Sequence, residues 1–214
     1  DFVFSDGLGR LNTGNAILSK FKITDAERIK LSLRSDQSPL IQYGYARRNI
    51  IKVKIPILEQ GGNDFYAVNI HATAFATDDT KQKHIEKYLE VLSTINADGH
   101  IFVSGGDLNS VPSGSVIDFC GNDICDDDEV DYTLEDHQEH KEGSYFANFE
   151  GEPNILDPLY TLYHPAIDFN SRNLPQHFTH APSTSRLIDG TLRKYDRKLD
   201  YLFTNRFWTQ NSGR

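Results

Sequence analysis

An acid and an amide, Asp107 and Asn109, lie two positions apart in the stretch VSGGDLNSVP (103–112). Side chains at positions i and i+2 of an extended chain point to the same side. A carboxylate accepts hydrogen bonds and a carboxamide both donates and accepts them, so the pair suits a hydrolytic water or a metal beside a phosphoryl oxygen. Asp and Asn are also ordinary turn residues, so the pair alone is at least as typical of a turn. We expect Gly105 and Gly106 to leave room for a substrate to approach.

The elements that must position this pair follow from hydrophobic periodicity. Residues 48–58 alternate isoleucine or valine with lysine, which predicts a half-buried strand, and residues 65–71 form the returning strand of an antiparallel pair. Residues 78–97 place apolar side chains on one helical face, with Lys81 among the charges on the opposite face. Residues 100–106 predict a buried strand. A strand, a helix and a strand followed by an acid indicate a layered α/β domain.

Outside these elements the pattern is less regular. Residues 14–23 are an apolar run that we expect to be followed by a charged turn, and residues 178–205 predict two strands, the second at 198–204. Residues 118–152 are rich in acids, which favours a solvated surface insertion. The spacing of Cys120 and Cys125 fits a small disulfide loop in an exported protein, but it is too wide for a CxxC pair.

Composition limits the function classes. The chain has 214 residues and a net charge of −9, which predicts one soluble domain and argues mildly against unspecific phosphate binding to nucleic acid. It contains no apolar run long enough for a transmembrane helix. The disulfide spacing and the acidic surface favour a secreted or cell-surface protein over a cytoplasmic one.

Four segments resemble a known superfamily in order and spacing. They are GNAILSKF (14–21), VNIHATAF (68–75), SGGDLNSVP (104–112) and RKLDYLFTN (197–205), and together they are similar to the endonuclease/exonuclease/phosphatase superfamily. The resemblance spans most of the chain except the acidic insertion. It implies a deoxyribonuclease I-like, four-layered α/β/β/α sandwich of two mostly antiparallel sheets flanked by helices. It also implies metal-dependent hydrolysis of phosphate mono- or diesters by a nuclease, phosphatase or phospholipase-like enzyme.

The resemblance assigns catalytic roles to four residues. Asp107 would orient the attacking water or ligate a metal, and Asn109 would bind a phosphoryl oxygen or that same metal. His71 would stabilise the phosphate or protonate the leaving oxygen. Asp200 would be a buried acid that orients a second histidine further along the chain. Without the resemblance, His71 is typical of a hydrogen-bonded histidine at a strand end, and Asp200 of a turn cap.

The resemblance also points to groups around the substrate. The segment RRNI resembles a family segment in which an arginine reaches the substrate phosphate, and the choice between Arg47 and Arg48 stays open. Either arginine is equally typical of a solvated surface. His177 and His180 lie in a loop that borders the active site in the family, although most such loop histidines have no catalytic role.

The expected cofactor is Mg²⁺, with Mn²⁺ or Ca²⁺ as alternatives, because hard oxygen ligands such as those of Asp107 and Asn109 suit these ions. The principal ligands of the family, an N-terminal glutamate and a C-terminal Ser-Asp-His segment, have no counterpart in residues 1–214. We therefore expect a single domain that lacks its N- and C-terminal strands, so that residues 1–214 alone would fold poorly, bind metal weakly and lack activity.

Two functions remain open from the sequence. The first is a monomeric enzyme whose partner is a phosphate-ester substrate, with nucleic acid, phosphoinositide and small ester unresolved. The alternative is a non-catalytic binding or scaffold protein on the same fold, which would use residues 118–152 to bind calcium or a basic partner.

Overall fold

A computed structural model describes six stretches of the chain: residues 14–44, 47–56, 63–74, 76–115, 154–180 and 198–209. The acidic segment 118–152, with Cys120 and Cys125, lies outside these stretches, as does most of the first strand expected within 178–205. In the described stretches, no helix is long and apolar enough to cross a membrane.

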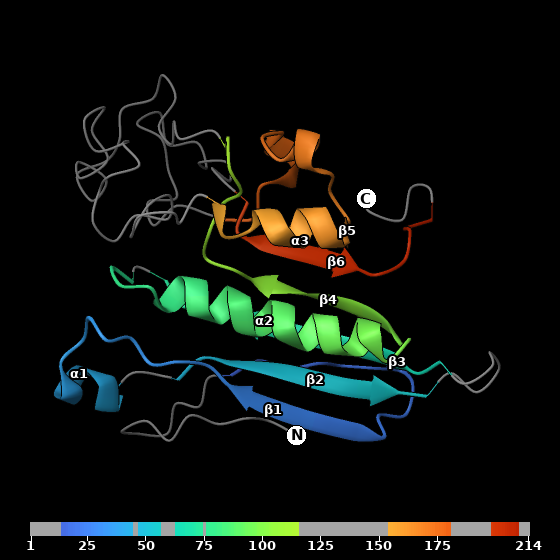
Figure 1. Cartoon of the computed structure of the whole chain (residues 1–214), viewed down its shortest axis with the longest axis horizontal. Helices are drawn as coiled ribbons and strands as arrows, with labels where there is room; N and C mark the ends of the chain where they lie inside the picture. The colour runs from blue at the N-terminus through green and yellow to red at the C-terminus, as the bar shows by residue number, and fades with distance from the viewer. Residues whose placement is uncertain are drawn as a thin grey trace, which may run out of the picture.

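The described residues form one six-stranded mixed sheet with helices packed on it (Figure 1). The strand order is β1-β2-β3-β4-β6-β5, and among these strands only β3 and β4 are parallel. The strands are β1 (Asp25–Lys30), β2 (Asn49–Ile55), β3 (Phe65–His71), β4 (Ile101–Asp107), β5 (His164–Pro165) and β6 (Asp200–Thr204). The helices are α1 (Pro39–Gly44), α2 (Thr80–Ala97), α3 (Asp157–Leu162) and the short 3₁₀ turns η3 (Phe169–Ser171) and η4 (Pro175–His177).

These elements confirm the α/β class that the periodicity predicted. β2 and β3 form the expected antiparallel pair, α2 is the expected helix, and β6 is the second strand expected in 178–205. A parallel pair needs a crossover connection, and α2 supplies it between β3 and β4. One sheet with helices on one face corresponds to half of the expected sandwich, and the described stretches contain no second sheet.

The main core lies between the sheet and the helices α2 and α3. Alternate residues of the strands enter it, among them Ile70 of β3, Phe102 of β4 and Phe203 of β6, each fully buried. Because side chains alternate across a strand, the residues between them point to the opposite face of the sheet. The candidate site residues His71, Asp107 and Asp200 lie on that opposite face, at the ends of β3, β4 and β6.

The charged turn expected after residue 23 is wrong, because β1 occupies Asp25–Lys30. β1 lies at the edge of the sheet and pairs only with β2, so almost all of its side chains are exposed. An edge strand of this kind carries charged residues on both faces. Its sequence, DAERIK, therefore lacks the apolar alternation by which strands are recognised.

The exposed position expected for Lys81 is also wrong, because its side chain is fully buried. The beginning of α2 buries Thr80 and Lys81 in its first turn and His84 in its second, in addition to the apolar face that continues down the helix. The start of the helix is thus covered on more sides than its later turns. Helical periodicity alone cannot predict such local cover.

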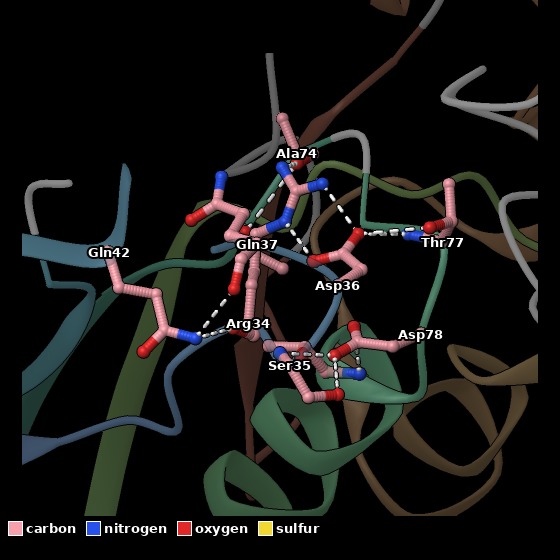
Figure 2. Close-up of polar contacts among 10 residues, drawn as sticks. Arg34, Ser35, Asp36, Gln37, Gln42, Ala74, Thr77 and Asp78 are labelled. Carbon is pink, nitrogen blue, oxygen red and sulfur yellow. Dashed lines mark hydrogen bonds and ion pairs between the residues drawn. The ribbon is translucent and has the colours of Figure 1, made fainter. Parts of the chain in front are cut away.

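A polar network joins the loop after β1 to the loop between β3 and α2 (Figure 2). Asp36 accepts two hydrogen bonds from the guanidinium of Arg34 at 2.8 and 2.6 Å, and one from the Thr77 N–H at 2.8 Å. Asp78 accepts from the Ser35 N–H at 2.6 Å and from the Thr80 N–H at 3.0 Å. The loop after β1 is therefore fixed to the loop between β3 and α2.

Gly105 and Gly106 allow the neighbouring strands to approach β4. The geometry favours this role over the expected one of leaving space for a substrate. A Cβ on Gly105 would lie 2.1 Å from the Tyr201 carbonyl oxygen of β6. A Cβ on Gly106 would lie 2.0 Å from the Ile70 carbonyl oxygen of β3, and Gly106 has a φ of +131°. Both strands can approach β4 because these positions lack side chains.

Replacing Gly106 by Ala is expected to lower the free energy of unfolding by about 3 kcal/mol or more, since the new methyl group collides with backbone that cannot move aside. Gly99→Ala is the matched control, because Gly99 also has a positive φ (+80°) but a Cβ at that position would meet no atom within 4 Å. Denaturant unfolding of the complete gene product measures both. Equal losses of unfolding free energy in the two variants would mean that the collision with the Ile70 carbonyl does not contribute to the destabilisation.

Candidate active site

Three neighbouring strands bring the predicted acids and histidine together on the sheet face opposite α2. In the strand register His71 of β3 is paired with Asp107 of β4, and Asp107 is paired with Asp200 of β6. Residues directly opposite each other in a sheet project to the same face. The His71 Nε2 and Asp107 Oδ2 atoms are 3.6 Å apart. The convergence of these distant segments, which the resemblance implied, is present in the structure.

Asn109 is built into the support of Asp107. Its backbone N–H donates to Asp107 Oδ1 at 2.8 Å, and its side-chain Nδ2 donates to the Ala72 carbonyl at 3.0 Å. Asn109 has a φ of +47°, a left-handed conformation that asparagine tolerates better than most residues. The residue is 3% exposed, and its side chain ties the end of β4 to the residue that follows His71.

The structure separates the two arginines that the sequence left equivalent. Arg48 Nη1 lies 2.9 and 3.0 Å from the two ring nitrogens of His71. Arg47 Nε donates instead to the Leu31 carbonyl at 2.9 Å, in the loop after β1. Arg48 is therefore the arginine that the fold brings to the histidine and the acid.

Burial gives this cluster unusual electrostatics. Burial raises the pKa of Asp107 to about 6, an effect that the nearby Asp200 carboxylate reinforces and the Asn109 N–H and Arg48 oppose. Burial, followed by the Arg48 charge, lowers the pKa of His71 to about 4, although Asp200 acts in the opposite direction. At pH 7 the site therefore holds a neutral imidazole beside a carboxylate, and the two do not form an ion pair.

Asp200 is exposed, so the buried carboxylate that the resemblance implied is not observed in the described residues. Its side chain points to the face without helices, where it lines a cleft of about 720 Å³ that His177 also borders. The Asp200 N–H donates to the Thr179 hydroxyl at 3.0 Å. Of the two loop histidines named from the sequence, His177 therefore borders the same cleft as Asp200, and the charge of His180 acts on Asp107 and lowers its pKa.

The donor set around Asp107 meets the requirements of a metal ion in part. Asp107 and Asp200 offer hard oxygen ligands on adjacent strands, which suits Mg²⁺ in kind. Among the described stretches, however, no three His, Cys, Asp or Glu side chains form a group that could hold a metal. The described residues therefore fit as part of a ligand set.

Sequence reasoning missed the groups that hold the catalytic candidates in place. The Ala72 carbonyl accepts from Asn109, and the Thr179 hydroxyl accepts from the backbone N–H groups of Leu199 and Asp200 at 3.1 and 3.0 Å. An alanine carbonyl carries no signal in a sequence. Thr179 lies in the segment QHFTHAP, in which only the two histidines suggest catalytic chemistry from the sequence.

The fold and the site define an α/β domain that brings carboxylates, an imidazole and a guanidinium together at the ends of neighbouring strands. The chain belongs to the Endonuclease/Exonuclease/phosphatase family, whose model matches residues 2–213. A search of curated proteins finds no match.

Several solved structures are similar to the chain. The human Nocturnin catalytic domain with bound sulfate anion is 12% identical, with a TM-score of 0.45 over 87% of this chain and 48% of that chain. Truncated TDP2 of Caenorhabditis elegans is 13% identical, with a TM-score of 0.39 over 88% of this chain and 54% of that chain. A mannosyl-6-phosphatase of Bacteroides thetaiotaomicron is 10% identical, with a TM-score of 0.42 over 87% and 53%. The chain thus spans about half the length of these structures.

Proposed function

We propose that this protein hydrolyses phosphate esters by attack of water at phosphorus, in a reaction that depends on a divalent metal ion. The observation that carries the proposal is the position of the Asp107 carboxylate, which is held by the Asn109 N–H and lies 3.6 Å from His71. Arg48 Nη1 lies 2.9 and 3.0 Å from the two ring nitrogens of the same imidazole. An acid, a neutral donor and a cation around one point suit a reaction at an anionic ester.

Asp107 orients the attacking water and accepts its proton as the new bond from oxygen to phosphorus forms. A base whose pKa lies near 6 is a carboxylate at neutral pH and still accepts a proton effectively. The bond from phosphorus to the leaving oxygen breaks, and that oxygen takes a proton from solvent. His71, neutral at pH 7, donates a hydrogen bond to a phosphoryl oxygen, and Arg48 balances the negative charge.

Mg²⁺ is the metal that we propose, with Asp107 and Asn109 among its oxygen ligands; when bound, it would neutralise charge on the phosphate and lower the pKa of bound water. Asp200, the cross-strand neighbour of Asp107, places a further carboxylate beside it. The protein's own contribution is to hold these groups in place before substrate arrives.

A small phosphate ester is favoured over an extended nucleic acid as the substrate. The chain carries 31 acidic against 22 basic residues, and nucleic acid is bound largely through neutralisation of several phosphates by basic side chains. A single phosphate can be balanced by a single arginine, and Arg48 supplies it.

Hydrolysis of bis-(p-nitrophenyl) phosphate by the complete gene product tests the proposal. We expect release of p-nitrophenol with Mg²⁺. Removal of the ion by EDTA should lower the rate at least about 100-fold, because charge neutralisation by the metal stabilises the transition state by several kcal/mol. Adding Mg²⁺ back should restore the rate. A rate equal to that of buffer at every metal concentration would instead favour a non-catalytic protein on this fold.

A further inference from the structure

His84 in the second turn of α2 is a fully buried histidine outside the candidate site. Its Nδ1 accepts a hydrogen bond from the Thr73 N–H at 3.2 Å, and its Nε2 lies 2.9 Å from the Ser32 carbonyl oxygen. A backbone N–H can only donate and a carbonyl can only accept, so the proton resides on Nε2. One neutral imidazole therefore joins two backbone segments.

The two segments that His84 joins are those that carry the site. Thr73 follows His71 by two residues, and between them Ala72 donates to the Asp107 carbonyl and accepts from the Asn109 side chain. On the other side, Ser32 follows Leu31, whose N–H donates to the Arg48 carbonyl at 3.0 Å. His84 thus links the backbone next to His71 to the backbone next to Arg48.

We propose that His84 is a positioning residue for the proposed hydrolysis: by bridging Thr73 and Ser32 it sets the placement of His71 and Asp107 relative to Arg48. The inference rests on the proposed function for its kinetic consequence, but its geometric content is independent of it. His84 is fully buried, so it acts through the backbone that it bridges.

The bridge requires a group with one acceptor and one donor. A protonated imidazole would have two donors, and Nδ1–H would then face the Thr73 N–H. Burial lowers the pKa of His84, and Arg48 adds to this, whereas the Ser32 carbonyl and Asp78 act in the opposite direction. A glutamine side chain also offers one acceptor and one donor, and it is the conservative replacement.

The loops do not depend on His84 alone for their folding. Arg34 donates from Nη1 to the Ala74 carbonyl at 3.1 Å, and the Asp36 and Asp78 contacts described above join the same loops further from the strands (Figure 2). Loss of the imidazole is therefore expected to displace the segments without unfolding them.

The kinetic test compares His84→Ala, His84→Gln and Leu92→Ala in the complete gene product, with bis-(p-nitrophenyl) phosphate and Mg²⁺. Leu92 is fully buried in the same helix about two turns further on, so it controls for general destabilisation. We expect kcat to fall about 10- to 100-fold in His84→Ala, as for small misplacements of catalytic groups, with KM changed far less. His84→Gln should recover kcat to within about threefold, and Leu92→Ala should lose melting temperature but keep kcat.

A second readout needs no activity. Exchange of the Asn109 side-chain amide, which donates to Ala72, is followed by NMR in the same variants. It should be slow in the wild type, His84→Gln and Leu92→Ala, and fast in His84→Ala. An inactive wild type would refute the proposed function while the amide exchange still decides on the bridge. Unchanged kcat and amide exchange in His84→Ala, or equal effects in Leu92→Ala, would overturn the proposal.

Discussion

Replacing Asp107 by Asn is expected to lower kcat/KM for phosphate-ester hydrolysis by about 10³-fold, because the carboxamide cannot accept the proton of the attacking water. The substitution keeps the shape of the side chain and an oxygen that can accept from the Asn109 N–H. The loss therefore reports removal of the carboxylate, both as proton acceptor and as proposed Mg²⁺ ligand, rather than a change of geometry. Initial rates with bis-(p-nitrophenyl) phosphate and Mg²⁺ measure it, and Asp98→Asn, an exposed carboxylate at the end of α2, is the control.

The activity should also depend on pH in a defined direction. Because burial raises the pKa of Asp107 to about 6, the wild-type kcat/KM should rise with pH as the carboxylate forms, and saturating Mg²⁺ should move this rise below pH 6, since a bound cation favours the ionised form. A folded-state pKa above the unfolded value also means that ionisation of Asp107 opposes folding at neutral pH. Asp107→Asn should therefore lose activity without losing melting temperature. Activity within tenfold of the wild type would refute the role of Asp107.

Elements with a clear hydrophobic period were predictable from the sequence. The alternation of Ile51, Val53 and Ile55 identifies β2, since these residues form a second apolar cluster on one face of the sheet. β1 was not predictable in the same way, because an edge strand exposed on both faces needs no apolar residues. The burial of Lys81 was equally hidden, because it depends on what packs over the first turn of α2.

The proximity of the candidate site residues was predictable from the sequence, but the geometry of their contacts was not. The order of four segments indicated that His71, Asp107, Asn109 and Asp200 meet. The strand register places His71, Asp107 and Asp200 side by side, and hydrogen bonds to Asp107 and Ala72 hold Asn109 beside them. The exposure of Asp200 and the hydrogen bonds of Asn109 were not predictable, because both depend on which strands lie next to β4. A sequence does not show which atoms an added side chain would meet, so the two glycines before Asp107 suggest substrate access although the neighbouring strands are what require them.

The neighbouring arginines Arg47 and Arg48 are expected to differ sharply in their effect on activity. Arg48→Ala should lower kcat/KM by about 100-fold, since it removes the cation beside His71 that would balance the phosphate charge. It should also raise the pKa of His71, because the Arg48 charge contributes to lowering it. Arg47→Ala removes a hydrogen bond to the Leu31 carbonyl, so it should cost about 1 kcal/mol of stability and little activity.

Arg48→Lys separates charge from geometry in the same experiment. A lysine keeps the positive charge but lacks the planar set of donors with which a guanidinium grips an anion, so we expect about tenfold lower kcat/KM, between wild type and Arg48→Ala. Steady-state kinetics of the three variants, with melting temperatures to exclude unfolding, measure the order. Were Arg47→Ala the more damaging change, the substrate would approach from the loop after β1, and the cluster around His71 would not be where the phosphate binds.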